Sequence, residues 1–268
     1  MAALTFDRFA QLRKTERPTI GALEDGLMTT FEPSLVLPFH NSWYRGHARL
    51  TGQNVLIYDV SSRAAQAVAV AYSREGAMVF IPVGIQASTA TALCDLIVKE
   101  GGSASLLQGC TEQERSTNLH CRLLCGCLDV LLNIVSPRGI AFGDANDPER
   151  ERTTAAGMIA PIVAALAAHR CAPRLLISAI FDINEDCGNQ GEDFATEEAA
   201  HLDLSQALGD RNVRVNAVHI SPAQLKSDGA LEAYLEEVAM AFVYLATDEA
   251  ADTNGLVLVK ETELSALH

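Results

Sequence analysis

Residues 49–79 read RLTGQNVLIYDVSSRAAQAVAVAYSREGAMV, and they set the pattern that most of the chain repeats. The apolar run at 53–58 predicts a buried strand. The alanine-rich stretch at 64–75 predicts a helix, and Gly76 suits the position just after a helix end. A second apolar run at 77–82 predicts the next strand. Strand, helix and strand within about 30 residues are typical of a parallel β–α–β unit.

The alternation of strands and helices continues toward the end of the chain. Helices are expected at 88–99, 116–124, 150–169, 195–208 and 230–246, and further strands at 104–107, 128–133, 174–180, 213–220 and 255–260. This spacing favours an α/β fold with a doubly wound, Rossmann-like parallel sheet.

Residues 1–50 differ from the rest because they show no sustained hydrophobic period. They hold Pro18, Pro33 and Pro38 and an aromatic group formed by Phe39, Trp43 and Tyr44. We interpret residues 1–50 as an N-terminal arm held by its aromatic side chains, and residues 51–268 as the Rossmann-like domain.

Composition narrows the classes of function and partner. The 268 residues carry 34 acidic and 20 basic side chains, for a net charge of −14, and 49% are hydrophobic. A surface this acidic repels nucleic acid and anionic membranes, so neither is expected as a partner. No apolar stretch approaches the roughly 20 residues of a membrane span, and the first residues lack an apolar signal segment. A cytoplasmic protein is expected.

Five segments, in the right order, resemble short-chain dehydrogenase/reductases. They are RLTGQNVLIYDVSSRAAQAVAVAYSREGAMV at 49–79, LDVLLN at 128–133, DFATEEAAH at 193–201, RVNAV at 214–218 and EEVAMAFVYLATDEA at 236–250. The resemblance covers roughly residues 47–260. It implies a Rossmann-like sheet that carries a nucleotide at the carboxyl ends of its strands.

The chain departs from this family at the turn that holds the nucleotide. The family reads Thr-Gly-x-x-x-Gly-x-Gly there, and its glycines let the backbone approach the phosphates. The corresponding residues here are Tyr58, Asp59, Arg63 and Ala65, and Cys110 replaces the aspartate that contacts adenine. Asp59 would repel a diphosphate. Arg63 either binds a phosphate or pairs with Asp59. We therefore expect no cofactor.

The family's catalytic positions are also altered. Phe194 takes the place of the tyrosine and Glu198 that of the lysine, while Ala179 aligns with the serine and Ser178 is the alternative match. Phenylalanine has no proton to transfer. The resemblance thus leads us to expect a non-redox enzyme, a cyclase, isomerase or lyase acting on a small biosynthetic intermediate, and not an NAD(P)-dependent dehydrogenase. The alternatives are a non-catalytic subunit paired with an active dehydrogenase paralogue, or a small-molecule binding protein; either a homo- or a hetero-oligomer is expected.

The candidate catalytic residues are Glu198, His219, Ser178 and Asp193. A carboxylate such as Glu198 can serve as acid or base in a partly apolar site, although a salt bridge or a solvated helix face is the alternative. His219 follows a strand near the expected site and could shuttle protons, or line the wall as a hydrogen-bonded residue.

A metal site is not expected. His120, Cys121, Cys125 and Cys127 lie close together in sequence, but no second pair of ligands accompanies them. Zinc sites usually combine two such pairs.

Overall fold

The computed structural model describes residues 44–58, 60, 62–83, 87–107, 128–134, 174–181, 190–209, 212–220 and 231–258. The predicted helices at 116–124 and 150–169 lie outside these residues, as do the metal candidates His120 to Cys127.

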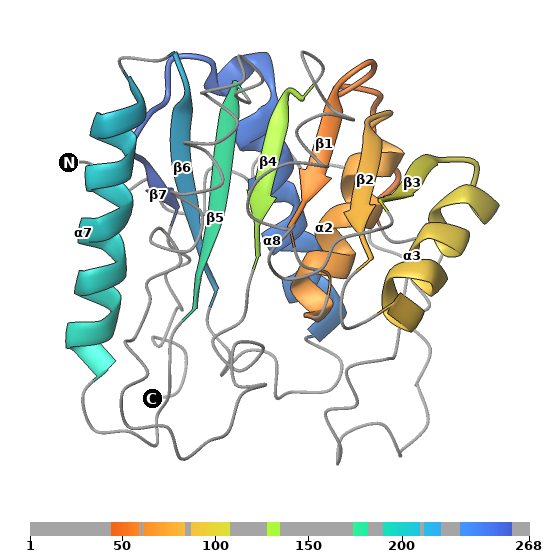
Figure 1. The fold of residues 1–268 in the computed structure, drawn as a ribbon, viewed down its shortest axis with the longest axis horizontal. Coiled ribbons are helices and arrows are strands. Elements are labelled where there is room, and N and C mark those ends of the chain that lie inside the picture. Colours follow the sequence, from red (N-terminus) through yellow and green to blue (C-terminus); the bar gives the residue numbers. More distant parts are fainter. Residues whose placement is uncertain are drawn as a thin grey trace, which may run out of the picture.

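Seven parallel strands form one sheet (Figure 1). In chain order they are β1 (Asn54–Ile57), β2 (Met78–Pro82), β3 (Ser103–Leu107), β4 (Val130–Asn133), β5 (Leu175–Phe181), β6 (Arg214–Ile220) and β7 (Val257–Leu258). They lie side by side in the order β3-β2-β1-β4-β5-β6-β7. The order reverses between β1 and β4, which is the switch point of a doubly wound sheet. The predicted fold class is confirmed.

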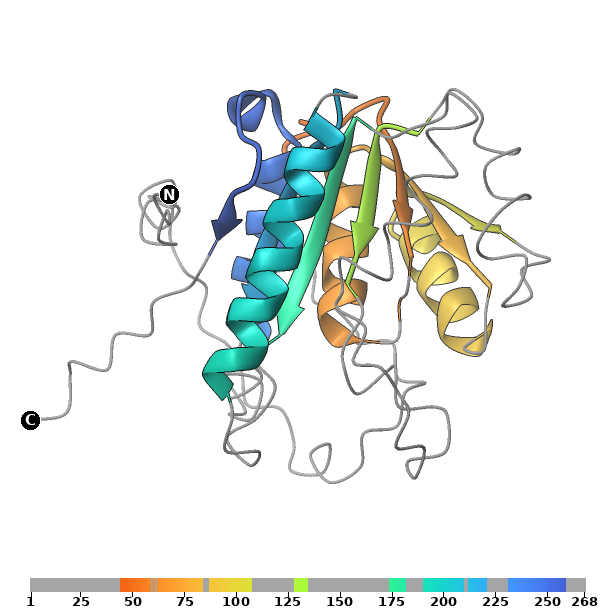
Figure 2. The same cartoon turned by 60° about the vertical axis from the view of Figure 1, so that its left-hand side comes forward.

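Helices cover both faces of the sheet (Figures 1 and 2). One face carries α2 (Arg63–Arg74), α3 (Ala87–Lys99) and α8 (Leu231–Ala246), and the other carries α7 (Gln190–Gly209). A short 3-10 turn, η3 (Asp248–Ala250), follows α8. None of the helices in the described ranges is long and apolar enough to cross a membrane.

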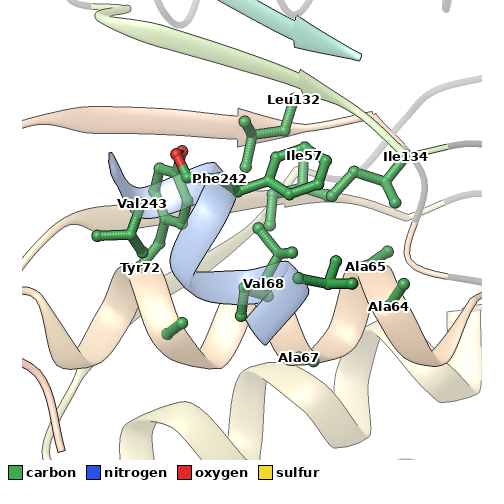
Figure 3. Close-up of a cluster of buried hydrophobic side chains, with 14 of the residues drawn as sticks. Ile57, Ala64, Ala65, Ala67, Val68, Tyr72, Leu132, Ile134, Phe242 and Val243 are labelled. Carbon is green, nitrogen blue, oxygen red and sulfur yellow. The ribbon is translucent and has the colours of Figure 1, made fainter. Parts of the chain in front are cut away.

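A first core cluster fills the space between the sheet and helices α2, α3 and α8 (Figure 3). The small side chains of α2, such as Ala64, Ala65 and Ala67, are almost completely buried there. Small residues permit close packing of α2 on its neighbours, and α8 is one of them. The phenol of Tyr72 also donates a hydrogen bond of 2.7 Å to the carbonyl of Phe242, which ties α2 to α8.

A second core cluster lies on the opposite face of the sheet, the face that carries α7. It consists of Leu56, Leu107, Leu128, Leu131, Leu176, Leu204, Leu208, Val213 and Val215. Successive strand residues point to opposite faces, so membership of the two clusters shows which way each strand residue points. Residues in step with Leu56, Leu131 and Leu176 face α7.

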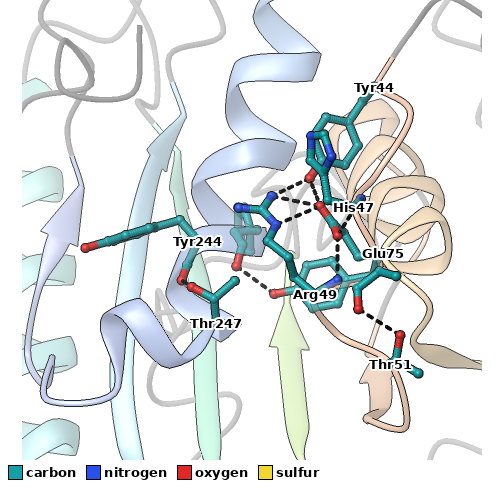
Figure 4. A network of polar contacts seen from close by, with 10 residues as sticks. Tyr44, His47, Arg49, Thr51, Glu75, Tyr244 and Thr247 are labelled. Atoms are coloured by element: carbon teal, nitrogen blue, oxygen red, sulfur yellow. Dashed lines mark hydrogen bonds and ion pairs between the residues drawn. The ribbon is translucent and has the colours of Figure 1, made fainter. Parts of the chain in front are cut away.

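The segment before β1 is fastened to the end of α2 (Figure 4). The Glu75 carboxylate accepts hydrogen bonds from the Tyr44 phenol, from the Arg49 guanidinium at 2.7 Å and from the backbone of His47 at 2.9 Å. Tyr44 itself is buried. The other aromatic residues proposed to hold the arm, Phe39 and Trp43, lie outside the described residues, so the division at residue 50 stays a prediction.

Two glycines near this junction test how closely the segment packs. Both have a positive φ, +73° at Gly46 and +81° at Gly52. A Cβ on Gly46 would lie 2.2 Å from the Arg74 carbonyl oxygen, whereas a Cβ on Gly52 would meet nothing within 4 Å. We expect Gly52→Ala to cost about 1 kcal/mol of conformational strain. Gly46→Ala should cost about 3 kcal/mol, because the backbone must also move.

Urea unfolding of the two variants measures this difference. Gly52→Ala serves as the matched control, since it carries the strain without the clash. Equal losses of stability in both variants would show that residues 44–50 do not pack on the end of α2 as described.

Candidate active site at the carboxyl edge of the sheet

The turn from β1 to α2 lies at the carboxyl end of β1. Ser62 caps α2, its hydroxyl accepting from the Ala65 backbone N–H at 3.1 Å. The Gln66 side chain donates to the Val60 carbonyl at 3.1 Å and closes the turn from within. Arg63 is the first residue of α2 and is partly exposed. A helix N-terminus favours anions, and Arg63 adds a full positive charge to it.

Ala65 occupies the last glycine position of the family's turn, and its side chain points inward. It is fully buried and belongs to the first core cluster. The methyl group therefore packs under the helix and takes no space in front of its N-terminus. Asp59 lies outside the described residues. The described part of the turn thus fits a phosphate group, with Arg63 and the start of α2 as the residues that would hold it.

A row of side chains crosses the sheet beside this turn. Tyr58 donates its backbone N–H to the Leu132 carbonyl at 2.9 Å, which places Tyr58 next to Asn133. Asn133 is paired in turn with Ser178 on β5. Tyr58 packs against the second core cluster, and Ser178 is in step with Leu176 of that cluster, so both lie on the face of the sheet that carries α7.

The same register places Ser178 and Ala179, the two candidate matches to the family's serine, on opposite faces of the sheet. Ala179 belongs to the first core cluster, on the face away from α7. Ser178 faces α7, which carries the segment aligned with the family's catalytic helix. The Ser178 hydroxyl is buried and has no hydrogen-bond partner within the described ranges.

His219 lies on the next strand, β6, and on the same face of the sheet as Ser178. It lies two residues beyond Ala217, the β6 partner of Ser178, and is partly exposed. Alternation along β6 puts His219 on the same face as Val215 of the second core cluster. Two of the four predicted catalytic residues, Ser178 and His219, are therefore brought to one face near the carboxyl edge.

The other two candidates lie on α7. Glu198 is exposed there. Asp193 and the neighbouring Phe194 belong to the same helix, but their side chains fall outside the described set, as does Cys110. Figure 2 shows the first turns of α7 beside the carboxyl end of β5. Within the described ranges, no group of three His, Cys, Asp or Glu residues is placed to hold a metal ion.

His201 is a buried residue that the sequence did not single out. It lies on the sheet side of α7 and is 2% exposed. Burial lowers the pKa of His201 to about 4, against a smaller opposite effect from the Val215 backbone. The burial of His201 was predictable from the sequence, because Leu204 and Leu208 follow it at helical spacing and mark the buried face of the helix.

Comparisons with known proteins identify the fold. No family model and no curated protein matches the sequence. Solved structures do match. A short-chain dehydrogenase from Mycobacterium smegmatis is 18% identical, with a TM-score of 0.60 over 83% of this chain and 97% of that one. The promiscuous reductase LugOII, which catalyses a keto-reduction in lugdunomycin biosynthesis, is 21% identical, with a TM-score of 0.57 over 80% and 97%.

The angucycline C-6 ketoreductase LanV with bound NADP is a third match. It is 18% identical, with a TM-score of 0.56 over 79% of this chain and 95% of that one. The fold of the chain is thus that of the short-chain dehydrogenase/reductases.

These neighbours contradict the expectation of a non-redox cyclase, isomerase or lyase, and with it the expectation that the chain is not an NAD(P)-dependent dehydrogenase. The alternatives of a non-catalytic subunit or a small-molecule binding protein are set aside for the same reason. The error has a physical cause. A residue that replaces a glycine need not fill the space of a nucleotide, and the Ala65 side chain is fully buried in the core instead.

Proposed function

We propose that this chain is an NADPH-dependent oxidoreductase that reduces a carbonyl group on a small molecule. The fold supports this, since the neighbours are reductases and dehydrogenases and one of them holds NADP. The observation that carries the proposal is Arg63 at the first position of α2, beside the switch point between β1 and β4.

The preference for NADPH over NADH follows from charge. In dinucleotide folds an acidic residue after the second strand binds the ribose hydroxyls of NAD, whereas an arginine accommodates the extra phosphate of NADP. Residues 78–87, which contain β2 and the turn after it, include no Asp or Glu. Arg63 supplies the cation. This arrangement favours the phosphorylated cofactor.

On the substrate side, the proposal assigns Ser178 and His219 to the carbonyl group. The Ser178 hydroxyl can donate a hydrogen bond to a carbonyl oxygen, because no described residue accepts it. His219 is the proton donor of the proposal, because histidine is the side chain that most often serves as general acid or base. When bound, NADPH would supply the hydride. Glu198 and Asp193, both on α7, remain candidates for contacts with the substrate.

Calorimetry with NADPH and NADH tests the cofactor. We expect NADPH to bind more tightly than NADH. Arg63→Gln should weaken NADPH binding by at least about tenfold and remove the preference, because hydrogen bonds to charged groups are among the stronger ones.

Lys99→Gln is the matched control for Arg63→Gln. It removes one exposed positive charge at the other end of a helix on the same face of the sheet, and it should leave both affinities unchanged. A wild-type chain that binds neither cofactor, or that binds NADPH without oxidising it in the presence of a panel of ketones, would overturn the proposed function.

A further inference from the structure

Tyr58 stands at the switch point, on the side of the edge opposite to Arg63. It is the first residue after β1, and from there the chain turns toward α2 on the first face of the sheet. The Tyr58 side chain instead packs on the second core cluster, on the face of the sheet that carries α7, and remains partly exposed. One turn of chain thus presents a phenol on one face and a guanidinium at the start of α2.

The neighbours of Tyr58 point to a ligand at this place. Along the row of side chains, Asn133 is adjacent to Tyr58 and Ser178 follows on the next strand. The Ser178 hydroxyl is 1% exposed and has no hydrogen-bond partner among the described residues. A buried hydroxyl without a partner costs free energy, so such groups usually mark a ligand or a bound water.

The two halves of a dinucleotide would meet different strands here. The adenosine half of a nucleotide is read at the end of β2. Tyr58 lies on the other side of the switch point in register, because its strand neighbour is Asn133 on β4, and Ser178 follows on β5. A phenol is suited to this position because it is amphipathic: its ring packs on apolar groups while its O–H donates to oxygen. It also brings no negative charge toward a diphosphate.

We propose that Tyr58 is a cofactor-binding residue whose phenol donates a hydrogen bond to the nicotinamide half of NADPH, at its ribose or the adjoining phosphate. This inference rests on the proposed function. In this proposal the Tyr58 hydroxyl donates to the cofactor a hydrogen bond of the kind that backbone N–H groups donate in a glycine-rich turn. It also divides the work: Arg63 holds the adenosine half and Tyr58 holds the nicotinamide half.

Binding measurements on the full chain test this division without any need for turnover. The probes are NADPH, nicotinamide mononucleotide and the adenosine bisphosphate that carries the 2′-phosphate. We expect Tyr58→Phe to weaken NADPH and nicotinamide mononucleotide by about tenfold, the loss of one good hydrogen bond. The adenosine bisphosphate should bind as tightly as before. Arg63→Gln should give the opposite pattern.

The outcomes separate the two proposals. If the wild-type chain does not bind NADPH, the proposed function fails and this inference fails with it. If the wild-type chain binds NADPH and Tyr58→Phe binds it equally well, only the role of Tyr58 is refuted. Equal weakening of both half-molecules by Tyr58→Phe would also refute it, because that result indicates a general disturbance of the turn. If Tyr58→Phe does not fold, Tyr58→His, which keeps a donor, should retain nicotinamide mononucleotide binding within a few fold; its complete loss would count against the proposal.

Discussion

Phe242→Ala should lower the free energy of unfolding by about 4 kcal/mol, the usual cost of removing a buried phenylalanine ring. Phe242 is fully buried in the first core cluster, in the layer between α8 and the sheet (Figure 3). Its backbone carbonyl also accepts the Tyr72 hydrogen bond. The loss combines apolar area returned to water with a cavity that rigid neighbours cannot close.

Urea or thermal unfolding measures this loss. Val98→Ala is the control, because Val98 lies on α3 and is 54% exposed. It should cost less than about 0.5 kcal/mol. A loss below about 1 kcal/mol for Phe242→Ala would mean that α8 does not pack on the sheet through this ring.

Glu75→Gln is the second variant with a large expected effect, about 3 kcal/mol at neutral pH. The Glu75 side chain is fully buried against a partly exposed Arg49. Burial alone would raise the pKa of Glu75, but the hydrogen bonds from Arg49 and Tyr44 outweigh it and lower the pKa to about 2. Removing one partner of a buried ion pair leaves the other charge uncompensated, which is costly.

The sign of the pH dependence follows from the same shift. The pKa of Glu75 is about 2 in the folded chain and near 4.5 when the carboxyl is free. Its contribution is therefore complete above pH 4.5 and is lost as the pH falls from 4.5 toward 2. The shift corresponds to about 3 kcal/mol. Wild type should lose this stability across that window, and Glu75→Gln should not.

Unfolding curves of both chains through the acid range check this prediction. His201 destabilises both chains as the pH falls from 6.5 toward 4, because its pKa is lowered by burial, so the difference between the chains isolates Glu75. Glu100→Gln is the matched control. It breaks the ion pair of Arg74 and Glu100 at 2.7 Å, which is partly solvent-exposed, and should cost under about 1 kcal/mol. Parallel curves for wild type and Glu75→Gln would contradict the assignment.

The spacing of hydrophobic residues predicted the bounds of the first strands and helix after residue 49 to within one or two residues. The strand expected at 53–58 is β1, the helix expected at 64–75 is α2, and the strand expected at 77–82 is β2. These elements were predictable because their burial pattern is local in sequence. The Glu75 network was not, since it joins residues 44–49 to a carboxylate 26 or more positions away.

The site shows the same limit. An alignment could not choose between Ser178 and Ala179, because a shift of one residue moves a side chain to the other face of the strand. The structure separates them: Ala179 belongs to the first core cluster, and Ser178 lies on the opposite face, beside Asn133. Likewise, the sequence alone shows only that Tyr58 and Ala65 both depart from the residues expected in a glycine-rich turn. Only packing distinguishes the Ala65 methyl group, which points into the first core cluster, from the Tyr58 phenol, which packs on the second core cluster.

Because the strands are parallel, the ion pair of Glu75 and the polar side chains at Ser178 lie at opposite ends of the strands. The helix α2 spans about 18 Å from Arg63 to Arg74, so the ion pair at Glu75 and the polar row at Ser178 lie at opposite rims of the sheet. Free-energy changes at sites this far apart are usually additive. Mutations that alter the polar row at the carboxyl rim can therefore be combined with mutations that reinforce the amino rim, with little epistasis between the two sets.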